Sequence, residues 1–147
     1  LRMLDYDCLS YKPDVVSILI GSNDAAVCMN TGRTLEATGF AENYRCLLGR
    51  IQEKTEARLV CMGPFIFPQP LEYSRWIPII RKIEETEQRI AGEHHALFLP
   101  LHDLLNREAQ RAGYDGITPD GIHLTWEGAG VVARTWIREV DRAGIFS

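Results

Sequence analysis

Short apolar runs alternate with longer amphipathic stretches along this chain. Three runs, Val15–Ile20, Arg58–Gly63 and Ala96–Pro100, contain few polar residues and several β-branched ones. Continuous apolar runs of this length are typical of parallel strands that are buried on both faces. The pattern therefore predicts three buried strands.

The stretches between and after these runs carry apolar residues at the i, i+3, i+4, i+7 spacing of core-facing helices. Their apolar positions are Tyr44, Leu47, Leu48 and Ile51; Trp76, Ile79, Ile80, Ile83 and Ile90, with Arg81, Lys82, Glu84, Glu85 and Glu87 largely opposite; Leu101, Leu104, Leu105, Ala109 and Ala112; and Ala129, Val132, Ala133, Trp136, Ile137 and Val140. Residues 25–39 show no period and are predicted to form a long loop. Strands that alternate with helices predict an α/β fold, with a parallel sheet covered on both faces. Without a repeat or a linker, residues 1–147 are expected to form a single domain.

Composition narrows the function classes. Hydrophobic residues make up 46% of the chain and charged residues 24%, with a net charge of −4. This balance is typical of a globular protein, and it carries no basic footprint for nucleic acid. No apolar run approaches the ~20 residues of a membrane span. Composition and pattern predict neither an oligomeric state nor a compartment.

The cysteine and histidine spacings predict no metal or cofactor. Cys8, Cys28, Cys46 and Cys61 match neither a zinc site nor a redox pair, so reduced thiols are expected. The adjacent His94 and His95 have no nearby pattern of further ligands.

One candidate for chemistry is the segment Pro119-Asp120-Gly121-Ile122-His123. An Asp that accepts from the Nδ1–H of a His fixes the tautomer, so that Nε2 faces outward as a base. Three residues is a short enough span for this contact, and Gly121 allows the backbone to turn. A turn acid followed by a polar surface histidine is the alternative interpretation.

A second candidate is Gly21-Ser22-Asn23-Asp24, which follows the first predicted strand. Ligands of open α/β sheets bind at the carboxyl ends of the strands. An Asn at that position can aim its side-chain N–H at a developing oxyanion. The alternative is a plain turn that leads into a loop.

Together these two segments resemble the third and fifth sequence blocks of the SGNH (GDSL-type) hydrolases, which include esterases, lipases, thioesterases and carbohydrate deacetylases. The resemblance implies a flavodoxin-like three-layer α/β/α sandwich with a parallel sheet of about five strands. It implies a small-molecule ester as substrate. It also implies that Asn23 is an oxyanion-hole donor, His123 the general base and Asp120 the residue that orients it.

The chain departs from that family in two blocks. The Gly-Asp-Ser block with the nucleophilic serine is absent, and so is the block that supplies a glycine N–H to the oxyanion hole. The chain is therefore expected to be the C-terminal portion of a longer polypeptide, with the N-terminal strands and the serine upstream and little activity on its own. Ser22 and Cys28 are poorer nucleophile candidates, because Ser22 is expected to face away from Asn23 and Cys28 has no evident base. A non-catalytic pseudoenzyme or a flavodoxin-like binding module is the rival class.

Three further features have two interpretations each. Arg33 could meet an anionic substrate group or be a solvated loop residue. The proline-rich segment Pro64–Pro70 could wall a cleft or pack on the core. His102-Asp103 copies the Asp–His pairing, but helical neighbours point about 100° apart and are not expected to bond.

Overall fold

The computed structural model describes residues 2–146 of the chain. Its strands are β1 (Val15–Leu19), β2 (Arg58–Met62) and β3 (Leu97–Leu99). Its α-helices are α1 (Leu4–Asp7), α2 (Ser22–Thr31), α3 (Leu35–Thr38), α4 (Phe40–Lys54), α5 (Ile77–Glu93), α6 (Leu101–Ala112), α7 (Tyr114–Ile117) and α8 (Trp126–Arg142), with 3-10 turns η1 (Leu9–Tyr11) and η2 (Leu71–Trp76). None of the described helices is long and apolar enough to cross a membrane.

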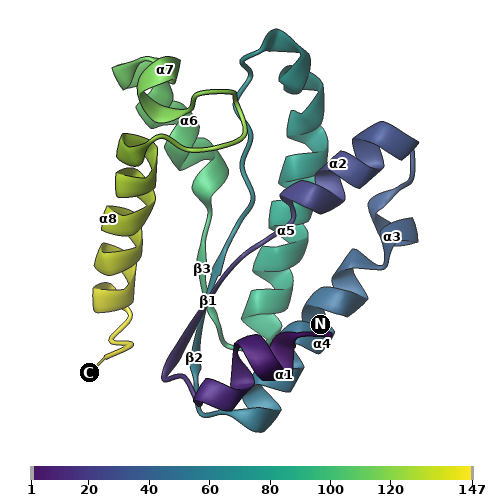
Figure 1. The fold of residues 1–147 in the computed structure, drawn as a ribbon, viewed down its shortest axis with the longest axis vertical. Helices are drawn as coiled ribbons and strands as arrows, with labels where there is room; N and C mark the ends of the chain where they lie inside the picture. The colour runs from purple at the N-terminus through teal and green to yellow at the C-terminus, as the bar shows by residue number, and fades with distance from the viewer. Residues whose placement is uncertain (1, 147) are drawn as a thin grey trace.

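The three predicted strands form one small parallel sheet in the order β1-β2-β3. Val15 of β1 is in register with Arg58 of β2, and Val60 of β2 with Leu97 of β3. Parallel strands end at the same edge, so the segments that follow β1, β2 and β3 all leave the sheet on one side. Both candidate segments lie toward this end of the molecule (Figure 1).

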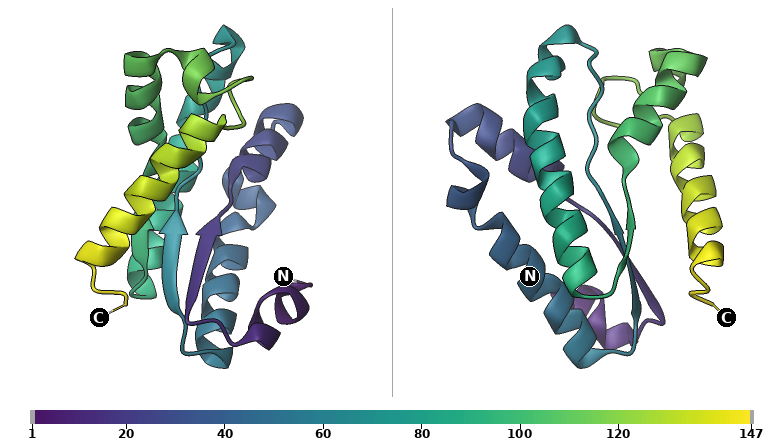
Figure 2. Two further views of the ribbon diagram at one scale, coloured as in Figure 1. Left: turned by 60° about the vertical axis from the view of Figure 1, so that its left-hand side comes forward. Right: turned by 180° about the vertical axis from the view of Figure 1, so that it is seen from behind.

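Helices cover both faces of the sheet. Alternate residues of β2 point in opposite directions, so this strand contributes side chains to a cluster on each face. Leu59 and Cys61 pack in one cluster with residues of α4 and α5. Val60 and Met62 pack in a second cluster with residues of α6 and α8. Figure 2 shows the sheet between α8 on one side and α4 and α5 on the other. The predicted α/β class with a parallel sheet is confirmed.

The burial of β1 differs from the expectation for a strand covered on both faces. Ile18 is buried, whereas Ser17, Leu19 and Ile20 are exposed, the last two to 42% and 39%. Within residues 2–146 no strand pairs with the outer edge of β1. On the α8 side, Val15 of β1 packs against the second cluster, and Trp136 Nε1 donates a hydrogen bond of 2.9 Å to Ser17 Oγ.

Residues 25–39, expected to form a loop, instead contain the rest of α2 and all of α3. Only Ala25 and Cys28 of α2 are buried, so this helix has no apolar stripe for a periodicity argument to detect. Gly32, in the left-handed conformation, ends α2, and the Thr34 hydroxyl caps α3 by accepting from the N–H of Ala37 at 3.3 Å.

Helix α8 begins where expected, after Thr125, whose hydroxyl accepts from the N–H of Gly128 at 3.1 Å. Its buried face matches the predicted stripe only in part: Val140 is buried, and Val132 and Trp136 are half-buried against the core. The buried positions are Gly128, Val131, Thr135 and Val140, whereas Ala129, Ala133 and Ile137 are exposed. Periodicity predicts that this segment is a helix. It does not predict which side is buried, because the apolar residues form more than one stripe.

Candidate active site

The loop between α7 and α8 is built around the carboxylate of Asp120. Its Oδ1 accepts hydrogen bonds from the backbone N–H groups of Ile122 at 2.9 Å and His123 at 2.8 Å. Gly121, between Asp120 and Ile122, has a φ of 86°, which a residue with a Cβ atom rarely adopts. These local bonds fold the loop so that residues 120 and 123 face each other.

The second carboxylate oxygen of Asp120 lies 2.7 Å from Nδ1 of His123. The bond to the His123 ring, together with the N–H groups of His123 and Ile122, lowers the pKa of Asp120 to about 2. Asp120 is therefore ionised at neutral pH and can only accept, so Nδ1 of neutral His123 carries the proton. Nε2 is left as the basic nitrogen, on a side chain that is 76% exposed.

Thr118, which the sequence patterns did not single out, joins the two ends of this loop. Its side chain is buried, and its hydroxyl donates to the carbonyl oxygen of His123 at 2.6 Å. The hydroxyl oxygen of Thr118 in turn accepts from the N–H of Gly121 at 2.8 Å. A threonine two residues before the Asp was the only sequence signal for this role.

The proline-rich segment Pro64–Pro70 packs against the loop that carries Asp120 and His123. The N–H of Phe67 donates to the carbonyl of Gly121 at 3.0 Å. A Cβ atom at Gly121 would lie only 2.0 Å from the carbonyl oxygen of Gln69. Both interpretations of this segment hold in part: Ile66 and Phe67 are buried in the core, whereas Gln69 and Pro70 are exposed and line a hollow.

Helix α6 anchors that segment through two side chains. Asn106 Nδ2 donates to the carbonyl of Ile66 at 2.9 Å, and Nδ1 of buried His102 accepts from the N–H of Ile66 at 3.4 Å. Burial, and then the nearby Arg81, lower the pKa of His102, which fits its role as an acceptor. Asp103 pairs with Arg81 instead, at 2.7 Å, so the expectation that His102 and Asp103 do not bond is confirmed.

Asn23 lies in the first turn of α2, directly after β1, and is exposed. Its side chain has no hydrogen-bond partner within residues 2–146, so its N–H₂ group is available to an incoming group. The structure brings Asp120 and His123 into contact, but not Asn23. The segment Pro64–Pro70 lies close to both candidate segments. It is bonded to the loop of Asp120 and His123, and it lies close to Gly21, two residues before Asn23, where an added Cβ atom would be 3.2 Å from Pro64.

Two hollows adjoin the Asp120–His123 loop. One, of about 210 Å³, is lined by Gln69, Pro70, Tyr114, Asp115, Thr118, Pro119, Asp120 and Gly121. The other, of about 300 Å³, is lined by Met29, Asn30, Glu72, Tyr73, Arg75 and Trp76. The ring of Tyr73 is close to Gly121, because a Cβ atom added at Gly121 would lie 2.8 Å from Cδ2 of that ring.

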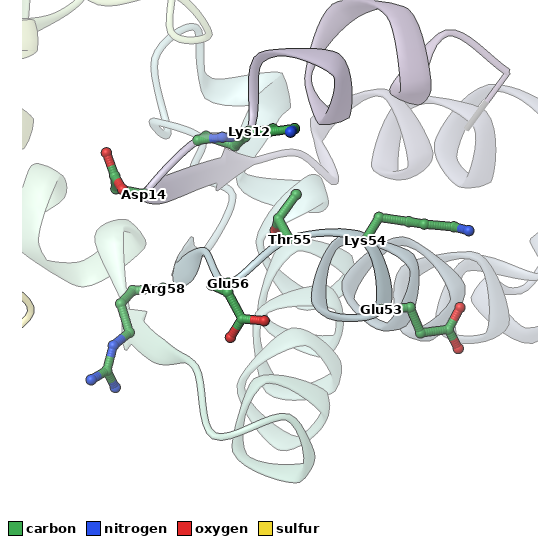
Figure 3. Close-up of a pocket in the computed structure, with 8 residues that line it drawn as sticks. Lys12, Asp14, Glu53, Lys54, Thr55, Glu56 and Arg58 are labelled. Carbon is green, nitrogen blue, oxygen red and sulfur yellow. The ribbon is translucent and has the colours of Figure 1, made fainter.

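A larger hollow, of about 530 Å³, lies at the opposite end of the sheet, beside the start of β1 and β2. Figure 3 shows that its charged side chains, among them Lys54, Glu56 and Arg58, point in different directions instead of converging. This hollow has none of the residues expected to carry chemistry.

The remaining expectations concern metals, thiols and Arg33. No group of His, Cys, Asp and Glu within the described residues could hold a metal ion, and the four cysteines are free. His94 lies 2.7 Å from the side-chain oxygen of Gln52. Arg33 donates to the carbonyl of Ala37 at 2.7 Å and so stabilises its own loop.

Two solved structures share this fold. A protein from Parabacteroides merdae described as a GDSL-like lipase is 25% identical, with a TM-score of 0.85, and the match covers 95% of this chain and 66% of that one. The acetylxylan esterase Axe2 from Geobacillus stearothermophilus is 22% identical, with a TM-score of 0.74 and coverages of 95% and 64%. This chain thus spans slightly less than two thirds of either structure. No curated protein matches it.

Three further structures of that esterase are described as catalytic mutants, with alanine in place of a serine, an aspartate or a histidine. The aspartate there precedes the histidine by three positions, the spacing of Asp120 and His123. The model of the GDSL-like lipase/acylhydrolase family matches residues 1–131. With a match over this share of its length, the chain belongs to the GDSL-like lipase/acylhydrolase family.

Proposed function

We propose that this chain supplies the base, its orienting acid and one oxyanion donor of a serine-ester hydrolase. The observation that carries the proposal is the 2.7 Å contact between Asp120 Oδ2 and His123 Nδ1, which leaves Nε2 basic and exposed. A base in this state can take a proton from a serine hydroxyl and return it to the leaving alcohol. Asp120 stabilises the imidazolium that forms in between.

Asn23 is the proposed donor to the tetrahedral oxyanion. Its side-chain N–H₂ is unpaired within the described residues and lies after the end of β1, where ligands of parallel sheets bind. An oxyanion-hole donor of this kind contributes about 3–4 kcal/mol to transition-state stabilisation.

The nucleophile is proposed to be a serine upstream of Leu1. No serine or cysteine within residues 2–146 is hydrogen-bonded to His123, which argues against Ser22 and Cys28. The exposed edge of β1 and the uncovered Leu19 and Ile20 fit a further strand beside β1 in the complete protein. Such a strand would extend the sheet toward the three-layer sandwich of the family. The fragment alone would be nearly inert, since loss of a triad nucleophile lowers turnover by on the order of 10⁶.

Acyl or acetyl esters of small alcohols are the proposed substrates. Support comes from the family itself and from the acetylxylan esterase among the similar structures. The hollow lined by Tyr73 and Trp76 could receive the alcohol portion, because it adjoins the loop that carries His123.

A nucleophile-mapping experiment tests the proposal on the complete protein. A fluorophosphonate probe should label one serine upstream of Leu1, and His123→Ala should abolish both labelling and hydrolysis of p-nitrophenyl acetate. His95→Asn is the matched control, because His95 is exposed at the end of α5 and asparagine tolerates its φ of 54°. A label on Ser22, or unchanged hydrolysis in His123→Ala, would refute the assignment and favour a non-catalytic module.

A further inference from the structure

Glu87 lies on a face of α5 whose other large side chains are isoleucines. It lies on the buried stripe of α5 with Ile80, Ile83 and Ile90, and 0% of its surface is exposed. The expectation that Glu87 lies on the polar side of this helix is therefore wrong. Neither carboxyl oxygen has a hydrogen-bond partner among the described residues.

The turn that carries Asn23 rests directly on this carboxyl. A Cβ atom at Gly21 would lie 3.4 Å from Glu87 Oε1 and 2.8 Å from Cγ2 of Ile83. Gly21 has a φ of 100°, and its carbonyl accepts the N–H of Ala25 at 2.9 Å to begin α2. The turn is therefore held between α5 and α2, and it cannot move closer to α5.

The groups around Glu87 disfavour a negative charge. Asp24 of α2 and Glu84 of α5 are acidic, and the Tyr44 hydroxyl of α4 and the Cys61 thiol of β2 are neutral groups whose pKa values burial raises. No cation or N–H donor from residues 2–146 contacts the carboxyl. Burial, then Glu84 and Asp24, raise the pKa of Glu87 to about 9.

We propose that Glu87 is a positioning residue for the Gly21–Asp24 turn: in its uncharged form it seats the turn that presents Asn23, and its ionisation displaces that turn. An ionised Glu87 has no partner in place and two acids nearby, so it must gain contact with water. The turn is the neighbour nearest to solvent, because Ser22 and Asn23 are exposed while Gly21 lies against the carboxyl, so an opening of the turn would bring water to Glu87. Glu87 does not touch the reacting atoms, and its role in hydrolysis rests on the function proposed for Asn23.

The test reads the turn itself and needs no hydrolysis. In this chain with ¹³C labels, the backbone carbon shifts of Gly21 to Asp24 are followed from pH 6 to 10.5. Wild type should show a transition centred between pH 8 and 10, and Glu87→Gln should show none in that interval. Glu85→Gln, an exposed neighbour on the same helix, should keep the transition. A turn that does not titrate in wild type, or one that still titrates in Glu87→Gln, would overturn the proposal.

If Glu87→Gln does not fold, the coupling between Glu87 and the turn can be tested in the wild-type protein alone. The ¹³Cδ signal of Glu87 in wild type should share one midpoint with the turn signals, and separate midpoints would refute the coupling. In the complete protein, kcat should fall above that midpoint for wild type and Glu85→Gln but not for Glu87→Gln. If the turn titrates as expected in a protein that hydrolyses no ester, the proposed function fails and the coupling between Glu87 and the turn stands.

Discussion

The hydroxyl of Thr118 donates a hydrogen bond of 2.6 Å to the backbone carbonyl of His123, five residues further along the chain. The same hydroxyl accepts from the N–H of Gly121, so one buried side chain holds both halves of the loop that bears the Asp120–His123 pair. The geometry of that pair therefore depends on a residue whose side chain is hydrogen-bonded to neither of its side chains.

Thr118→Val should destabilise the loop, because valine keeps the shape of threonine but leaves the buried N–H of Gly121 unpaired. The expected loss of unfolding free energy is about 1–3 kcal/mol, measured by urea denaturation. In the complete protein, kcat should fall more than KM changes. Thr118→Ser keeps the hydroxyl and should retain most of the stability; equal losses in both variants would contradict the role of the hydrogen bonds.

Asp120→Asn should change the tautomer of His123. An amide can offer its N–H₂ to Nδ1, so the ring proton would move to Nε2 and the base would be lost. We expect kcat in the complete protein to fall by on the order of 10⁴, as for the equivalent change in serine proteases. Long-range ¹H–¹⁵N NMR of this chain reports the tautomer directly, and a proton that stays on Nδ1 in the variant would exclude this explanation.

Asn23→Ala should lower kcat by about 10²–10³ in the complete protein with little change in KM, because the proposed contact forms only in the transition state. The side chain is exposed and unpaired within the described residues, so the melting temperature should hardly move. Asn43→Ala, at an exposed asparagine on α4, is the control for stability. A normal kcat in Asn23→Ala would remove Asn23 from the oxyanion hole.

Asn106→Ala should loosen Pro64–Pro70 from α6. It removes the donor to the carbonyl of buried Ile66, at an expected cost of about 1–3 kcal/mol in unfolding free energy. Hydrogen exchange at the N–H of Phe67, which bonds to Gly121, should become faster. Gln110→Ala, an exposed change on the same helix, should do neither. Unaltered exchange at Phe67 would separate Asn106 from the support of the loop.

Glu87→Gln should remove a pH dependence of stability. In the unfolded chain this carboxyl has the ordinary glutamate pKa of 4.5, whereas burial raises its pKa in the folded chain to about 9. The folded state therefore binds more protons in this interval, and its unfolding free energy falls as pH rises, by up to about 1.4 kcal/mol per pH unit. The gap between Glu87→Gln and wild type should widen from pH 5 to 9 in chemical denaturation and then level off. A constant gap would show that the folded carboxyl is already ionised.

The local features of this protein follow from its sequence. Apolar runs identified β1, β2 and β3, and a three-residue spacing with an intervening glycine was enough to predict the contact between Asp120 and His123. Both predictions depend on bonds between near neighbours or on composition within a short window, so they need no knowledge of the rest of the fold.

Tertiary structure decided which faces are buried and what supports the site. Part of the stripe predicted for α8 is exposed, because the apolar residues of this helix form more than one stripe and only packing against the sheet selects between them. Glu87 lies on the buried stripe of its helix although its side chain is polar, because the turn at Gly21 and the sheet occupy the space around that stripe. The chain of contacts from Asn106 through Ile66 and Phe67 to Gly121 joins segments tens of residues apart, and no local pattern encodes contacts at that range.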